Sequence, residues 1–512
     1  MNVKEYSYSF FKNTSLKGIL LKCIFAVVLF LGSWKVYQAG IGLPFNKKIF
    51  LVVSLVLVLA IVLASCLKQL HHAVFVIIVL VGGVFACTSP TVDVPDEFAH
   101  TSRAIFISEG NVNLGNKDFE VRMSENWRDL LPKKKTYLTE SGLDKKEILN
   151  KKSVNRYLKI TNAYAFISYL PSVVGILIAK VLGLSFFWLI VLGRLTNLLF
   201  YAFVSAFAVK KVKQFKIPLT MMALLPMNIY FAASFNQDTF SFAILLLAFS
   251  ILTNILFAKE KIDYKLVLLY TFLCSILVFT KLPYVLLVGA LVFIPIKKYA
   301  SRLQYFGTYG LSLFVAVLSL VWFKLYSQIN TSNVDVNMPP AGVDVAGQLE
   351  FMLQHKILGI KVLLKGLFGL NSEQLFKFGP LSYFSSQANI LFIMMFAVIF
   401  FFAPVKKGAS TVTRIGLALI SLGIALAIQL SMYLSWTPVG WDHIQGVQSR
   451  YYIGVLVFLP LVTNIFRNTL NAIGLNDSIE KVNYNSEKVS DVVLYASMLL
   501  LILMTAISLA NN

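Results

Sequence analysis

Long apolar runs recur along the chain, and most are separated from the next by a short polar connection. A run of about 20 apolar residues is long enough to cross the hydrocarbon core of a bilayer as a helix. The pattern therefore predicts an all-α integral membrane protein, a polytopic bundle of about thirteen transmembrane helices. The predicted spans are 19–37, 48–66, 72–88, 186–209, 217–235, 238–257, 265–280, 282–296, 303–326, 388–404, 412–434, 450–466 and 491–509.

The amino-acid composition agrees with this pattern and bears on whether the partner is membrane lipid or nucleic acid. Hydrophobic residues make up 57% of the 512 residues and charged residues only 14%, which is typical of a membrane protein. The formal net charge is +22, but the basic residues lie in short clusters between apolar runs. We interpret this charge as topological, so we expect contact with membrane lipid and no nucleic-acid partner.

The basic clusters also predict an orientation. Lys and Arg gather in alternate connections, for example between Lys210 and Lys216 and between Lys259 and Lys265, whereas the intervening connections carry few. Because cytoplasmic loops of membrane proteins are enriched in Lys and Arg, we predict a multi-pass cell-membrane protein with a cytoplasmic N-terminus and an external C-terminus. The first run follows a basic segment without a small-residue cleavage pattern, so we expect it to be retained.

Two long polar insertions then fall on the external side and divide the chain. We predict three spans in 1–87, a first external loop in 88–185, a transmembrane core in 186–326, a second external loop in 327–387, and the last spans in 388–512. Both loops are expected to carry interfacial helices. One of these is the apolar stretch 160–182, because counting it as a span would place the Lys210 cluster outside.

The first loop opens with the acidic motif that is the strongest candidate for chemistry. Asp96, Glu97, His100 and Arg103 follow Pro95 at helical spacing, so that one helix face is expected to carry carboxylates, an imidazole and a guanidinium. Asp96, Glu97 and His100 could provide a general base or bind a divalent ion such as Mg²⁺ or Mn²⁺. The alternative is that the acids only stabilise the helix start and that His100 is solvated.

Ionisable residues in three other turns lie where a membrane protein normally avoids them. Asp238 and Lys281 each lie at an external turn between spans, and Arg450 begins a span from the external side. Such residues are costly unless they are paired or functional. Asp238 and Lys281 could simply pair with each other, and Arg450 could reach lipid phosphates or bind a substrate phosphate through its fork of donors.

These motifs resemble those of a bacterial family of polytopic membrane proteins catalogued as a domain of unknown function, which is similar in layout to the GT-C glycosyltransferases. The motifs that carry the resemblance are Pro95-Asp-Glu-Phe-Ala-His100, Ser234-Phe-Asn-Gln-Asp238, Lys281-Leu-Pro-Tyr284 and Gly446-Val-Gln-Ser-Arg450-Tyr451. The resemblance implies a GT-C-like fold and transfer of a sugar from a polyprenyl-phosphate donor. It also implies a set of substrate-binding residues, namely Arg103, Asp238, Lys281, Gln448, Arg450 and Tyr451.

On this basis we expect an inverting membrane glycosyltransferase that acts on a cell-envelope glycan or lipid acceptor at the external face. Asp96 would be the general base, with Glu97 and His100 positioning it or binding the metal. Two alternatives stay open: a lipid-linked oligosaccharide flippase or other transporter, and a polysaccharide polymerase. Transporters often show inverted repeats and place ionisable groups near the bilayer midplane, and neither feature is evident in this sequence.

Overall fold

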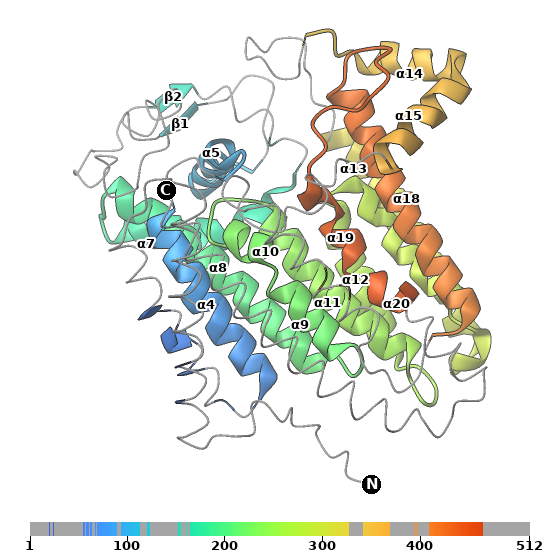
Figure 1. Cartoon of the computed structure of the whole chain (residues 1–512), viewed down its shortest axis with the longest axis horizontal. Helices are drawn as coiled ribbons and strands as arrows, with labels where there is room; N and C mark the ends of the chain where they lie inside the picture. Colours follow the sequence, from blue (N-terminus) through green and yellow to red (C-terminus); the bar gives the residue numbers. More distant parts are fainter. Residues whose placement is uncertain are drawn as a thin grey trace.

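The computed structural model of the protein describes residues 69–89, 94–112, 120–122, 152–154, 164–326, 341–368 and 409–463, with a few isolated positions. The described part is helical, apart from one short antiparallel ribbon in which β1 (Glu120–Arg122) pairs with β2 (Lys152–Val154). Most helices run side by side as a bundle (Figure 1). The predicted spans 19–37, 48–66, 388–404 and 491–509 lie outside these ranges, as do both termini.

Five of the described helices are long and apolar enough to cross a membrane, and all five were predicted. Helices α8 and α11 are central: α8 packs against α4, α7 and α11. Helix α13 presents mainly exposed apolar side chains, as expected of a surface that faces lipid. The five helices are α4 (Leu70–Thr88), α8 (Phe186–Lys211), α11 (Asp238–Leu256), α13 (Arg302–Tyr326) and α18 (Thr411–Ser435).

Two predicted spans form a shorter antiparallel pair. Helix α12 covers Tyr264–Val278, and the next element, η4, is a 3₁₀ helix over Leu282–Phe293. Because a 3₁₀ helix rises about 2.0 Å per residue, the 12 residues of η4 extend about 24 Å, further than an α-helix of the same length. A further 3₁₀ turn, η5 (Ile296–Lys298), leads into α13.

Two other predicted spans are wrong as single helices. The stretch 217–235 is divided into α9 (Lys216–Ala223) and α10 (Pro226–Ala232), with the break at Leu224 and Leu225. Proline has no backbone N–H to continue a helix, so Pro226 begins a new helix instead of extending the first. The stretch from 450 is likewise divided into η7 (Ser449–Tyr452), α19 (Ile453–Leu456) and α20 (Leu459–Thr463), the last of which contains Pro460.

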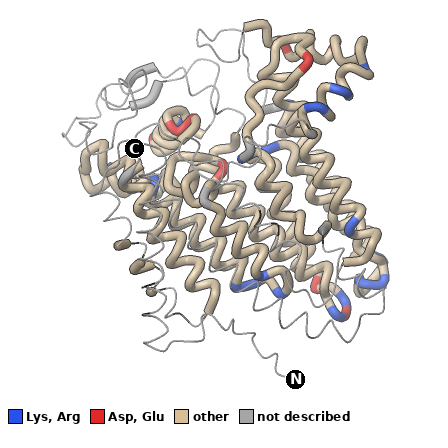
Figure 2. The backbone as a smooth tube through the Cα atoms, in the orientation of Figure 1, with Lys and Arg blue, Asp and Glu red and all other residues tan. Residues whose placement is uncertain are grey.

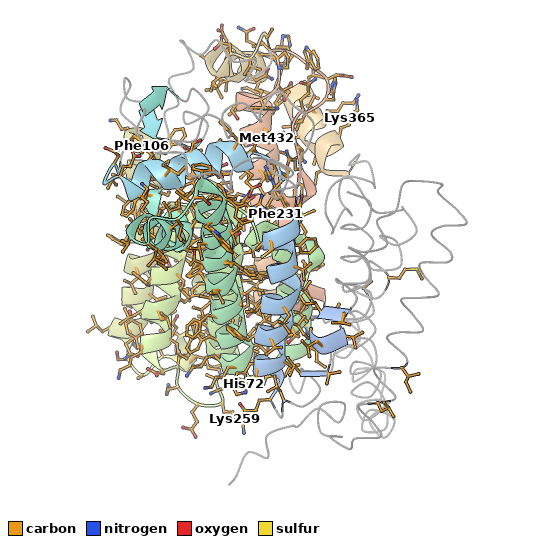
Figure 3. The ribbon with its side chains drawn as sticks, turned by 90° about the vertical axis from the view of Figure 1, so that its left-hand side faces the viewer. His72, Phe106, Phe231, Lys259, Lys365 and Met432 are labelled. Atoms are coloured by element: carbon orange, nitrogen blue, oxygen red, sulfur yellow. The ribbon has the colours of Figure 1, made fainter. Side chains whose placement is uncertain are left out.

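The first polar insertion places two helices at one end of the bundle. Helix α5 (Glu97–Ser108) lies across this end instead of along the bundle (Figures 1 and 3). The turn η3 (Phe166–Tyr169) leads directly into α7 (Leu170–Val181), and together they form an apolar helical segment shorter than the five long helices. The interfacial position of 160–182 stays a prediction.

The second insertion contributes a helical hairpin at the same end. Helix α14 covers Val345–Gln354 and α15 covers Lys356–Phe368, within the segment predicted to be amphipathic. Figure 3 shows Lys365 of α15 at the same end as Phe106 of α5, and His72 and Lys259 at the opposite end. We refer to these two ends as the α5 end and the basic end.

The charge distribution distinguishes the two ends. Figure 2 shows most Lys and Arg of the connections at the basic end, together with a few acidic residues, whereas at the α5 end acidic residues lie near α5 and basic residues lie on α15. The basic connections are those that contain Lys210, Lys211, Lys213, Lys259, Lys261, Lys297 and Lys298. The alternation of basic and sparsely charged connections in the sequence thus corresponds to two opposite ends of the described bundle.

Candidate functional site

Four charged side chains from distant parts of the sequence meet at the α5 end. Arg450 Nη2 lies 2.9 Å from Asp96 Oδ2, and Arg450 Nε lies 3.5 Å from Asp238 Oδ2. Lys281 Nζ lies 2.6 Å from the other oxygen of Asp238, Oδ1. We call these four residues the charge cluster. All four were predicted as site residues, and the pairing of Asp238 with Lys281 was the alternative considered for those two.

Asp96 reaches this cluster because it stands just outside its helix. Its backbone has a φ of +64°, in the left-handed region, and its side chain makes no capping hydrogen bond to α5. This conformation costs a non-glycine residue roughly 1–3 kcal/mol, so surrounding contacts must maintain it. The prediction that Asp96 and Glu97 both lie in the first turn of the helix is therefore wrong, because Asp96 lies just before α5 and only Glu97 belongs to its first turn. The two carboxylates have separate partners.

Glu97 is fully engaged in a different, deeply buried network. Its Oε1 and Oε2 accept from Nε and Nη2 of Arg194, each at 2.8 Å, and Oε1 also accepts from the backbone N–H of Phe235 at 3.2 Å. Arg194 Nη1 donates to the carbonyl oxygens of Ala86 and Ser89. This network ties α5 to α4, α8 and the turn before α11, so the geometry makes Glu97 a positioning residue instead of a catalytic one.

His100 lies behind the cluster and is held in its neutral form. Its Nδ1 is 2.9 Å from the hydroxyl oxygen of Tyr169, and its ring packs against Tyr164. Burial lowers the pKa of His100 to about 4, although the charges of Asp96 and Asp238 act in the opposite direction. The side chain is 5% exposed, so the alternative of a solvated His100 is wrong.

The predicted metal-binding set is not assembled. Glu97 uses both carboxylate oxygens on Arg194, whereas Asp96 is paired with Arg450 and His100 with Tyr169. Within the described residues no three His, Cys, Asp or Glu side chains are grouped closely enough to hold a metal ion. The geometry therefore gives Asp96, Glu97 and His100 three separate roles.

Several hydrogen-bond donors around the cluster are buried without an acceptor. In the described part of the chain, Arg450 Nη1, the Tyr284 hydroxyl and Asn236 Nδ2 form no hydrogen bond. Gln237 Nε2 donates to Asp238 Oδ1 at 2.7 Å, and the Asp238 N–H donates to Asn236 Oδ1. Buried donors without an acceptor cost about 1–3 kcal/mol each, and they are the groups that an oxyanion would satisfy.

Aromatic rings enclose the two cations. The Arg450 guanidinium lies 5.2 Å from the ring centre of Phe231 and 5.4 Å from that of Tyr451, while Lys281 Nζ lies 4.9 Å from the Tyr451 ring centre. Rings at this distance stabilise a cation that burial has desolvated. Tyr451 thus belongs to the site, as predicted. Gln448 lies next to it, half-buried at the start of η7, and its Oε1 has no hydrogen-bond partner among the described residues.

Arg103 does not join the charge cluster. Its Nη2 donates to the carbonyl oxygen of Val112 at 2.9 Å, and its guanidinium lies over the ring of Phe106. Burial lowers the pKa of Arg103. The predicted common helix face of Asp96, His100 and Arg103 is therefore not a single contact surface, because each of the three has a different partner.

Two residues of this region, Arg194 and Tyr169, were not singled out in the sequence, and Tyr284 was noted only as the end of the motif Lys281-Leu-Pro-Tyr284, without a role. A signal existed for Arg194, since it is a lone cation in the middle of the apolar run 186–209, where charge is costly. No comparable signal existed for Tyr169, since tyrosines are common near membrane interfaces.

Comparison with known proteins identifies a family. The family model described as "Predicted membrane protein (DUF2142)" matches residues 78–459, which include all the residues of the charge cluster. No curated protein matches the chain.

Proposed function

The chain belongs to the DUF2142 family of predicted membrane proteins, and we propose that it is an inverting glycosyltransferase of GT-C-like type. In this proposal it moves a sugar from a polyprenyl-phosphate donor to a hydroxyl group of a cell-envelope glycan or lipid. The α5 end, which is remote from the basic connections, would face the outside of the cell.

The observation that carries this proposal is the association of two cations with buried donors that lack acceptors. Arg450 and Lys281 lie on the two sides of Asp238, and Arg450 Nη1, Tyr284 and Asn236 each retain a free donor among the described residues. A phosphate offers several acceptor oxygens and negative charge in one group, so it satisfies both requirements. Helices α11 and η4, which begin at Asp238 and directly after Lys281, are apolar, which suits a phosphate attached to a lipid.

Asp96 is the best candidate for the general base. Its side chain is 39% exposed, compared with 3% for Asp238, whose two oxygens are already held by Lys281 and Arg450. A base must reach the proton it removes, and Asp96 is the carboxylate of the cluster that an acceptor hydroxyl can approach. Asp238 instead holds the two cations in position.

The charges of the cluster lead to a defined sequence of events. Two carboxylates already balance two cations, so the donor phosphate binds through the donors that are still free, which are Arg450 Nη1, the Tyr284 hydroxyl and Asn236 Nδ2. Asp96, on the exposed side of the cluster, accepts the proton of the acceptor hydroxyl as that oxygen attacks the anomeric carbon. The bond between this carbon and the phosphate oxygen breaks, and Arg450 and Lys281 stabilise the departing polyprenyl phosphate in a region of low dielectric constant. Attack opposite the leaving group inverts the anomeric centre.

A lipid-linked oligosaccharide flippase remains the second candidate, because α9 and α10 form a discontinuous helix. Helices broken in this way often form substrate sites in transporters. In transporters, however, the ionisable residues usually lie near the bilayer midplane, whereas here they meet at the α5 end. This difference favours the enzyme.

The proposal can be tested with purified protein in nanodiscs, supplied with polyprenyl phosphates that carry different radiolabelled sugars and with a lipid extract as acceptor. Wild type should move label from the donor to an acceptor fraction, and Arg450→Ala should not. Lys259→Gln, at an exposed position of the basic end, is the control and should transfer normally. In sealed vesicles, label that reaches the opposite leaflet while still attached to its donor would instead support the flippase.

A further inference from the structure

The α14–α15 hairpin carries an exposed apolar stripe on each helix that the rest of the described structure leaves uncovered. On α14, Val345, Leu349 and Leu353 recur every four residues and are half exposed or more. On α15, Ile357, Ile360 and Leu364 form a second stripe, and Ile357 is 85% exposed. An exposed group of six large apolar side chains on two short helices usually marks a surface that contacts a membrane, a ligand or another protein.

Lysines flank this surface. Lys356, Lys361 and Lys365 of α15 are all exposed, and the last two follow the stripe on its polar side. Lys365 Nζ lies 3.4 Å from Asp442 Oδ2. In the described part of the chain, no carboxylate forms an ion pair with Lys356 or Lys361. An apolar stripe bordered by Lys is the pattern of a helix that lies in a membrane interface, with its lysines reaching the phosphates.

Contacts with α18 fix the hairpin near the boundary of the bilayer. The Gly366 carbonyl oxygen accepts from Gln429 Nε2 at 3.0 Å, and the Gly440 N–H donates to Gln348 Oε1 at 3.0 Å. Gln429 lies 18 residues beyond Thr411, the first residue of α18, and therefore about 27 Å along that helix. Since a hydrocarbon core is about 30 Å thick, a span that enters at Thr411 brings Gln429 close to the opposite headgroups.

We propose that the α14–α15 hairpin is a lipid-binding site, which inserts its apolar stripe into the leaflet at the α5 end and binds anionic phospholipid headgroups through Lys356 and Lys361. The charge of these lysines favours anionic lipid over a second copy of this face, because two such copies would bring lysines of like charge together. The inference does not depend on glycosyl transfer.

The hairpin is also connected to the charge cluster. Gln429 Nε2, which contacts Gly366, also donates to the hydroxyl oxygen of Tyr452. Tyr452 belongs to η7, the same turn that carries Arg450 and Tyr451. Gln429 of α18 thus links the hairpin to the turn that supplies Arg450.

The experiment uses the full chain in proteoliposomes with an environment-sensitive fluorophore on a single introduced cysteine. Cys23, Cys66, Cys87 and Cys274 are first replaced by Ala. The label is placed at Leu353 or at its neighbour Gln354, which lies on the polar side of α14. Spin-labelled lipids should quench the fluorophore at Leu353 and aqueous iodide should quench that at Gln354. Iodide quenching at both positions, or protection of Leu353 from both quenchers by a protein partner, would overturn the proposal.

A second comparison tests the choice of lipid. With the fluorophore at Ile357, spin-labelled phosphatidylglycerol should quench at least about twofold more than spin-labelled phosphatidylcholine, since each lysine near an anionic surface favours it. The preference should vanish in the Lys356→Gln/Lys361→Gln variant and persist in Lys259→Gln, at the basic end. Equal quenching by the two lipids in the unsubstituted hairpin would contradict the anionic-lipid site.

Discussion

Glu97 and Arg194 form a fully buried, two-pronged ion pair, with both N···O distances at 2.8 Å and neither side chain exposed. Replacing one partner leaves the other charge buried without compensation, at a cost of about 3–5 kcal/mol. We expect Glu97→Gln to lower the stability of the protein to unfolding by SDS or heat by this order. Activity should then fall because α5 loses its attachment to α4 and α8.

The matched control for this pair is the exposed one between Lys365 and Asp442. Asp442→Asn should leave unfolding unchanged, because water screens such a pair. A Glu97→Gln protein as stable as wild type would show that the buried pair does not hold α5 in place.

The buried His100 predicts how stability depends on pH. The pKa of an unfolded histidine is about 6.5, whereas that of His100 in the folded protein is about 4. Above pH 6.5 neither state is protonated and His100 contributes no pH dependence. Between pH 6.5 and 4 the unfolded state alone binds the proton, so stability falls as pH falls, by up to about 3 kcal/mol. Unfolding midpoints of wild type and His100→Gln should diverge in this range.

Exposed His355 provides the control, because His355→Gln should keep the wild-type slope. A His100→Gln protein whose stability still falls in parallel with wild type would place the pH dependence elsewhere.

Because α7 packs closely on α8, we expect one added methyl group at Gly175 to destabilise the folded protein. A Cβ at Gly175 would lie 2.2 Å from the carbonyl oxygen of Leu192, a backbone atom that cannot move away easily. Gly175→Ala should therefore separate the two helices and destabilise the protein by about 1–3 kcal/mol. Gly310→Ala on α13 meets no atom within 4 Å and should be neutral or slightly stabilising. Equal unfolding midpoints for the two variants would contradict the packing.

The orientation in the membrane can be tested by labelling introduced cysteines in a background without the native ones. Asn111→Cys and Asp442→Cys are exposed at the α5 end, and Glu260→Cys is exposed at the basic end. A membrane-impermeant thiol reagent should label the first two in intact cells and the third only after the cells are opened. The reverse result would place the site in the cytoplasm.

The sequence predicted those parts of the fold that follow from length and apolarity alone. Five long helices begin and end within about two residues of the predicted bounds, because apolar runs end where charged or turn residues begin. The prediction of 217–235 as one span rested on hydropathy, which is continuous across Leu224 and Leu225, and it did not use the signal of Pro226 at the break.

The site was predictable as a set of residue types but not as a network. Ionisable residues in turns marked Asp238, Lys281 and Arg450, because such positions are costly in a membrane. Helical spacing predicted that Asp96 and Glu97 would act together, but the left-handed backbone of Asp96 separates them. The contact of Asp96 with Arg450 joins residues 354 positions apart, and only the tertiary structure could show it.

The role of Asp96 as the general base is tested most directly by measuring turnover and donor binding together in Asp96→Asn. This change keeps the size of the side chain but removes its ability to accept a proton. Transfer of labelled sugar should fall by about 10²–10⁴-fold, while the donor Kd stays within a few-fold of wild type. A folded and inserted Asp96→Asn protein that transfers sugar at nearly the wild-type rate would contradict the assignment of Asp96 as the base.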